Sequence, residues 1–136
     1  MSDLRAEFEA AVRYSYGSFL QFDPEAIERG DADDGAVWHG WFLDPVRGKA
    51  GRADDIAAAK RRGPLRLDLE PPVVTFHGNV AIARYYLDFA FAPPNATSGR
   101  VWVTPVFERD PSAPAGWRRL HRHEGMVPAG RPPLPD

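Results

Sequence analysis

The N-terminal part of the chain spaces its apolar residues as an amphipathic helix does. Small or apolar side chains return every three or four positions, at Leu4, Phe8, Ala11, Val12, Ser15 and Phe19. This spacing puts them on one face of a helix, the face expected to pack on a core. Ser2 or Asp3 is suited to cap the start of that helix. Asp23 and Pro24 predict a second, short helix that ends at Gly30.

The middle of the chain mixes turn, strand and helix signals. Residues 31–35 predict a turn, and the apolar and aromatic run 36–43 predicts a strand. Residues 44–51 contain proline and glycines and predict a loop. The alanine-rich segment 53–62 predicts a third helix, because its last turn is basic and Gly63 and Pro64 follow as a stop.

From Leu65 onward the apolar pattern changes to a period of two, which predicts strands. We expect these strands at residues 65–70, 73–76, 80–91, 100–109 and 117–126, with a hairpin turn at 77–79. Helices followed by antiparallel strands predict an α+β fold, with the helices on one face of a curved sheet. We expect one domain over residues 1–127 and a proline-rich tail over 128–136.

Composition excludes several classes of protein. The 136 residues are 43% hydrophobic and 26% charged, which is incompatible with disorder over most of the chain. The net charge of −2 offers no basic excess for nucleic acid. The chain contains no cysteine, so disulfides, thiolate metal sites and a thiol nucleophile are excluded. No apolar run predicts a signal peptide or a membrane span, and we therefore expect a cytoplasmic protein.

The order of these elements, with the closing pattern Trp-x-x-Leu-His-x-His-x-Gly at 117–125, resembles the nuclear transport factor 2-like superfamily. Together with the segment 104–110, this pattern looks most like the SnoaL-like polyketide cyclases and ketosteroid isomerases of that superfamily. It is also similar to the association domain of calcium/calmodulin-dependent protein kinase II. The resemblance covers residues 4–127 and implies a cone, in which the sheet wraps around the first helix and leaves an apolar pocket. It also implies a homodimer that pairs through the outer face of the sheet.

The resemblance implies three catalytic candidates near the start of the chain. Asp44 stands where ketosteroid isomerases place their proton-shuttling carboxylate. An apolar cone would desolvate that carboxylate and raise its pKa, which suits a general base. Tyr16 or Tyr14 stands near the helix tyrosine that donates to a developing oxyanion, and the helical spacing favours Tyr16 as the pocket-facing one. The alternatives are a solvated loop aspartate and tyrosines that only pack.

Two positions depart from the relatives. The second oxyanion donor of the isomerases would fall on Phe107, which cannot donate a hydrogen bond. The kinase association domains line their cavity with arginines that hold carboxylates, whereas the corresponding positions here are Glu124 and Pro105. Steroid isomerisation by the family mechanism and a cavity tuned to anions in the same way are therefore not expected.

His121 and His123 are candidates for acid–base chemistry or for a metal site. A regular strand would place both on one face with Trp117 and Arg119, because side chains repeat every two residues. Either imidazole could act as an acid, a base or a donor in the cavity wall, assisted by His39. A metal site would need completion by His39 or Glu108, and the resemblance itself implies no metal and no cofactor.

The long strand 80–91 has two dissimilar faces, and the sequence does not decide which one lines the pocket. One face carries Arg84 and Tyr86, which are candidates to bind a ligand if this face is the inner one. Aromatic side chains are further candidates for the pocket wall: Trp38, Trp41, Phe42, Trp102 and Phe107.

These observations lead to one main prediction and two alternatives. The main prediction is a pocket for a small apolar, ring-bearing ligand, with proton transfer in an isomerisation, dehydration or cyclisation. The first alternative is a non-catalytic ligand-binding or dimeric interaction module. The second alternative is a metal-dependent enzyme that uses His121 and His123.

Overall fold

Helices come first and most of the strands follow, in a computed structural model that describes residues 3–20, 24–38, 46–94 and 96–128. Within these residues the chain forms three helices, α1 (Leu4–Leu20), α2 (Pro24–Gly30) and α3 (Gly48–Arg62). The same residues form seven strands: β1 (Asp31–Trp38), β2 (Val46–Arg47), β3 (Leu65–Leu69), β4 (Val73–His77), β5 (Val80–Phe91), β6 (Ser98–Arg109) and β7 (Trp117–Met126).

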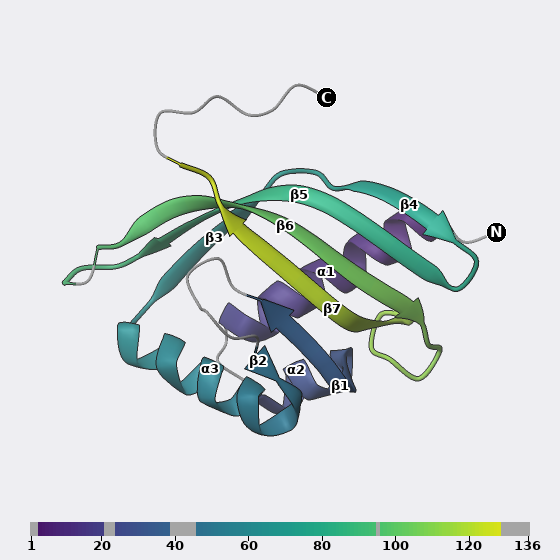
Figure 1. The fold of residues 1–136 in the computed structure, drawn as a ribbon, viewed down its shortest axis with the longest axis horizontal. Coiled ribbons are helices and arrows are strands. Elements are labelled where there is room, and N and C mark those ends of the chain that lie inside the picture. Colours follow the sequence, from purple (N-terminus) through teal and green to yellow (C-terminus); the bar gives the residue numbers. More distant parts are fainter. Residues whose placement is uncertain (1–2, 21–23, 39–45, 95, 129–136) are drawn as a thin grey trace.

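The strands form one curved sheet in the order β2-β1-β7-β6-β5-β3, with β4 also paired to β5 (Figure 1). Neighbouring strands are antiparallel except for β1 and β7, which run parallel. Helix α1 crosses the concave side of the sheet, behind it in Figure 1, while α2 and α3 lie at one end of the curve. This arrangement leaves the concave side as the place for a core and a pocket.

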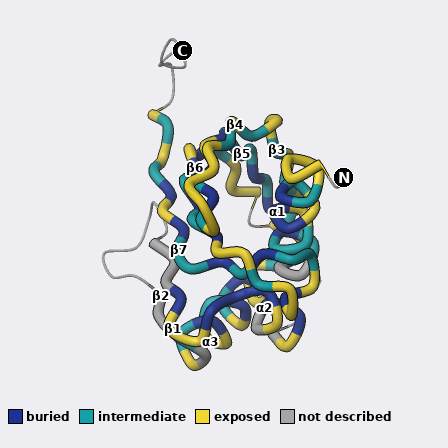
Figure 2. The backbone as a smooth tube through the Cα atoms, turned by 90° about the vertical axis from the view of Figure 1, so that its right-hand side faces the viewer, coloured by how far each residue is buried: buried dark blue, intermediate teal, exposed yellow. Residues whose placement is uncertain are grey.

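The core lies between α1 and the concave face, as the spacing of apolar residues along α1 predicts. Phe8 is fully buried, and its ring meets Phe107 edge to face with centroids 5.0 Å apart. The ring of Trp117 meets Phe8 in the same way at 5.6 Å. Figure 2 shows the buried segments gathered where α1 faces the strands. Burial of such aromatic side chains stabilises the fold by roughly 2 to 3 kcal/mol each.

Alternation along β5 settles which face of the sheet points inward. The buried residues are the apolar row Ala81, Ala83, Tyr85, Leu87, Phe89 and Phe91. Arg84 and Tyr86 therefore lie on the convex face, since successive side chains of a strand point to opposite sides. These two candidates therefore do not contribute to the pocket wall.

Two elements begin five residues earlier than the sequence predicts. Strand β1 begins at Asp31, so the residues expected to form a turn belong to an irregular strand whose pairing with β7 shifts between Asp31 and Ala36. Helix α3 begins at Gly48 instead of Ala53. Both extensions are held by tertiary contacts: the buried carboxylate of Asp31 binds Arg119 of β7, and Arg52 of α3 donates to the carbonyl of Ala32.

Candidate ligand pocket

A pocket lies between the C-terminal half of α3 and the concave face of the sheet. Its apolar wall comes from four elements: Ala58 and Ala59 of α3, Leu65 and Leu67 of β3, Leu87, Phe89 and Phe91 of β5, and Val101 of β6. The free volume, counted as positions open to the centre of a water-sized sphere, is about 50 Å³, which is several times the roughly 10 to 15 Å³ that a single water needs on this measure.

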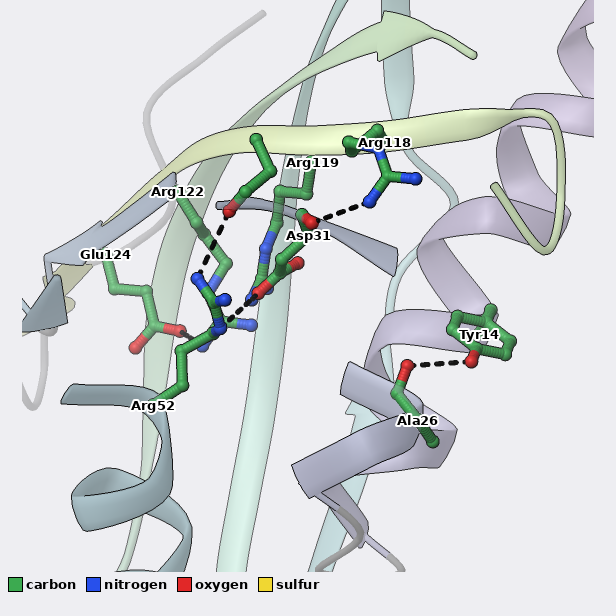
Figure 3. Close-up of polar contacts among 9 residues, drawn as sticks. Tyr14, Ala26, Asp31, Arg52, Arg118, Arg119, Arg122 and Glu124 are labelled. Carbon is green, nitrogen blue, oxygen red and sulfur yellow. Dashed lines mark hydrogen bonds and ion pairs between the residues drawn. The ribbon is translucent and has the colours of Figure 1, made fainter. Parts of the chain in front are cut away.

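Five polar residues complete the wall of this pocket: Tyr16 of α1, Asp55 and Arg62 of α3, and Arg122 and Glu124 of β7. Arg122 and Glu124 form an ion pair of 2.9 Å, and only 6% and 4% of their side-chain surfaces are exposed. Figure 3 shows both side chains leaving β7 toward the interior. A charged pair at this depth makes the pocket polar at one end and apolar elsewhere.

Tyr16 places a phenol at the polar end of the pocket. Tyr85 of β5 donates a hydrogen bond of 2.6 Å to the oxygen of Tyr16, and the rings meet edge to face at 6.0 Å. Burial raises the pKa of both phenols, and the total rise is larger for Tyr85, because the Tyr16 phenol raises its pKa further. The guanidinium of Arg122 lies 5.2 Å from the centre of the Tyr16 ring. Tyr16 is therefore neutral at physiological pH and can donate its own hydrogen.

Arg122 keeps its charge inside the protein because of its neighbours. Burial disfavours the guanidinium and is the largest single effect, but the neighbouring groups, with the carboxylate of Glu124 first among them, together outweigh it, so the pKa of Arg122 is raised. The carboxylate of Asp55 contributes further stabilisation of the charge. The sequence gives no sign of this pair, because Arg122 and Glu124 are expected on the outer face of a regular strand.

A β-bulge in β7 explains the difference. Val106 of β6 pairs with His121, but the next residue, Phe107, pairs with Arg119, so Leu120 is an extra residue. From His121 onward, each side chain of β7 therefore points to the opposite face of the sheet from the one it would have in a regular strand. The expectation that His121 and His123 share a face with Arg119 is wrong, and Arg122 and Glu124 point inward instead.

His121 and His123 consequently lie on the convex side of the sheet. His121 is half-buried, and its pKa is lowered by burial and by the neighbouring charges of His123 and Arg119. Among the residues that the structure describes, no three histidine or acidic side chains come close enough to hold a metal ion. Glu108, considered as a further ligand, is exposed on β6, and His39 lies outside the described residues.

Three other residues that were expected at the site lie outside the pocket wall. The Tyr14 hydroxyl donates to the carbonyl of Ala26 at 2.7 Å and joins α1 to α2 (Figure 3). Phe107 is 1% exposed and packs in the core against Phe8, outside the pocket wall. Trp102 lies on the convex face with 43% of its surface exposed, so its expected place in the pocket is wrong.

The remaining expected residues are not placed. Trp41, Phe42 and Asp44 lie outside the described residues, and Trp38 is described as backbone of β1 only. Asp44 as general base therefore stays a prediction.

A second buried polar cluster holds β1 and α3 against β7. Arg119 binds the Asp31 carboxylate at 2.7 Å, and Arg52 stands 3.9 Å from the same oxygen. Arg118 donates to the backbone carbonyl of Asp31 at 2.8 Å (Figure 3). These bonds fix the first half of α3, while its second half, with Ala58 and Ala59, covers the pocket.

No protein-family model matches the chain, and no curated protein matches it by sequence. By structure it is similar to the calcium/calmodulin-dependent protein kinase II hub from S. rosetta, with a TM-score of 0.80 and 16% identity over 93% of this chain and 99% of the hub. An NTF2-like protein with a cystatin-like fold from Novosphingobium aromaticivorans gives 0.75 at 23% identity, over 93% of this chain and 83% of that one. A proposed dehydratase of the NTF2-like family from Streptomyces avermitilis gives 0.76 at 18% identity, over 91% and 97%.

These similarities confirm the predicted α+β cone, which is the fold of the nuclear transport factor 2-like superfamily. One cone thus serves a hub and a proposed dehydratase, so the fold does not decide the function. Within the described residues, no helix is both long enough and apolar enough to cross a membrane.

Proposed function

We propose that this chain binds a small, mainly apolar molecule in the pocket under α3, with the Tyr16 phenol donating a hydrogen bond to an oxygen of that molecule. The observation that carries the proposal is the neutral, buried phenol of Tyr16 at one end of an apolar wall. A donor in such surroundings favours a ligand that accepts a hydrogen bond, because an unpaired buried polar group is costly. A ketone on a short carbon chain satisfies both parts of the pocket.

The reaction that suits this arrangement is proton transfer next to a carbonyl. A base removes a proton from the carbon beside the carbonyl, and the Tyr16 phenol stabilises the negative charge that develops on the oxygen. We assign the base to Asp44, as the resemblance implies. The solved NTF2-like structures include a proposed dehydratase, and the abstraction of such a proton is a step in dehydration and isomerisation alike.

Binding and catalysis are tested with one neutral probe, pentan-2-one. Wild-type protein should bind it, and Tyr16→Phe should weaken binding about tenfold, which corresponds to one lost buried hydrogen bond. Tyr86→Phe is the matched control, since Tyr86 lies on the convex face. In D₂O, the protein should accelerate deuterium incorporation beside the carbonyl, and Asp44→Asn should abolish this while binding persists. Binding without exchange would support the non-catalytic alternative.

A second proposed role is assembly through the convex face of the sheet. Trp102 is 43% exposed there beside the half-buried Tyr86, and the half-buried pair Ile82 and Val106 lies further along the same face. Exposed apolar surface of this kind is typical of protein interfaces. Similarity to the kinase hub adds support for a homodimer. Light scattering should give the mass of a dimer, and Trp102→Ser should give that of a monomer.

A further inference from the structure

We propose that the ligand is amphiphilic and anionic, so that its apolar part enters the pocket while a carboxylate or phosphate binds Arg61 and Arg62 at the mouth. This inference rests on the proposed function, and it adds the charge of the ligand and the residues that recognise it. It is carried by an apolar pocket and a basic groove that share two lining residues.

The two cavities are adjacent and share part of their lining. An open groove of about 620 Å³ is lined by Ala58, Arg61, Arg62, Gly63, Pro64, Pro93 and Pro94. Ala58 and Arg62 also line the apolar pocket, so the groove and the pocket lie side by side at these two residues. A molecule longer than the small inner space would extend along this path and would meet two guanidinium groups at its exit.

Arg62 is fixed over the pocket wall. Its guanidinium lies 5.8 Å from the centre of the Phe91 ring, and Phe91 is itself part of the wall. A guanidinium stacked on a ring keeps its donors directed to the sides, where they can bind two oxygens of one anion. Arginine suits carboxylate and phosphate equally, because its forked donors match both groups.

Arg61 and Arg62 are not neutralised by partners within the described part of the chain. No ion pair there involves either side chain, and the residues three and four positions before them in α3 are alanines, at 57–59. Both side chains are exposed. Their charge is therefore available to a ligand that reaches the mouth.

The inner end of the pocket does not attract an anion in the same way. Arg122 is paired with Glu124 and is also stabilised by the charge of Asp55. A second anion placed there would meet both carboxylates. The charge distribution therefore directs the anionic end outward to Arg61 and Arg62, and the neutral oxygen inward to Tyr16.

Lys60 provides a matched control for these two arginines. All three cations stand in the last turn of α3 and gain equally from the negative end of the helix dipole. Lys60 is exposed but lines neither the pocket nor the groove. The change Lys60→Gln removes the same charge as Arg61→Gln or Arg62→Gln, without touching the proposed site.

The test compares 5-oxohexanoate with its neutral analogue 5-oxohexanamide by calorimetry. The carboxylate should bind about tenfold more tightly, and the double change Arg61→Gln and Arg62→Gln should remove this preference. Lys60→Gln should keep it, and about 1 M sodium chloride should reduce it. Calorimetry with hexanoate and with hexyl phosphate shows which anion the site prefers, because the preferred group gives the higher affinity.

Each outcome separates this inference from the proposed function. Equal binding of the acid and the amide, with Tyr16 still required, would overturn the anionic assignment and leave the ketone site in place. A preference that survives the double arginine change would overturn it as well, because the anion would then bind elsewhere. If pentan-2-one, 5-oxohexanoate and 5-oxohexanamide all fail to bind, the proposed function and this inference are both wrong. Ala58→Phe should fill the pocket and abolish binding of every probe.

Discussion

The phenol of Tyr85 on β5 donates a 2.6 Å hydrogen bond to the phenol of Tyr16 on α1, and these residues are far apart in the sequence. The bond joins the first helix to the centre of the sheet, at the polar end of the pocket. Since Tyr85 supplies the hydrogen, the hydrogen of Tyr16 is directed elsewhere. The pair thereby orients the one donor on which the proposed function depends.

Removal of this hydrogen bond should weaken both the fold and the site. Tyr85→Phe is expected to lower the free energy of unfolding by about 1 kcal/mol, the net contribution of one such bond. It should also lower the affinity for pentan-2-one about threefold, because Tyr16 becomes a poorer donor when it no longer accepts a hydrogen bond. Urea unfolding and calorimetry measure the two effects. Unchanged affinity would show that Tyr85 has only a structural role.

Alkaline pH should destabilise the protein through the same two phenols. Their pKa values are raised in the folded state, so between the unfolded value of about 10 and the folded values the native state holds more protons than the unfolded state. The free energy of unfolding must then fall as pH rises, by up to about 1.4 kcal/mol per pH unit for each phenol. Below about pH 10 the contribution is constant.

Urea unfolding between about pH 9 and about pH 11 measures this slope. The double change Tyr16→Phe and Tyr85→Phe should make the slope smaller, since other groups that titrate in this range are common to both proteins. Identical slopes would show that these tyrosines titrate normally.

The buried pair of Arg122 and Glu124 should be sensitive to the loss of one partner. Glu124→Gln is expected to cost about 3 kcal/mol, because the Arg122 charge stays buried with less compensation. The exposed pair of Arg66 and Asp68, also short at 2.8 Å, is the matched control, and Asp68→Asn should change stability by less than about 0.5 kcal/mol. Similar losses for both variants in urea unfolding would contradict the burial of the inner pair.

The indole of Trp102 covers Gly125, and a glycine should be required at this position. A methyl group added at Gly125 would overlap Nε1 of Trp102 and stand 2.7 Å from its Cε2 atom. Gly125→Ala should therefore displace the indole from β7 and lower stability by about 1 to 2 kcal/mol. In a Trp102→Ala background the same change should be neutral or stabilising, since alanine suits a strand better than glycine. A double-mutant cycle with additive effects would argue against the contact.

Much of the sheet follows directly from the period of apolar residues. The predicted bounds of β5 and β7 agree with the structure, because one face of Val80–Phe91 is apolar throughout and Trp117–Met126 lies between Gly116 and Pro128. The apolar face of α1 was also predictable from spacing, and Phe8, Val12 and Tyr16 are buried on it. Local pattern is sufficient where one face of an element meets the core over its whole length.

The polar side of the pocket could not be predicted in this way. Leu120 is an ordinary strand residue, so nothing in its type marks the bulge that turns Arg122 and Glu124 inward. The strand at Asp31 was missed for a related reason: three aspartates and a glycine at 31–35 favour a turn, but bonds from Arg118 and Arg119 hold the segment in the sheet. Interactions between residues distant in sequence override the local preference in both cases.

The extra residue at Leu120 means that β7 encodes two alternative interiors. If residues 121–126 slid by one position and absorbed Leu120 into regular pairing, two imidazoles would replace the guanidinium and the carboxylate beside the ligand. Shortening the chain by Leu120 itself would not have this result, since His121 would keep its partner Val106. A one-residue shift in the pairing of β7 would therefore replace an ion pair by two imidazoles in the pocket wall, although every residue of the strand stays the same.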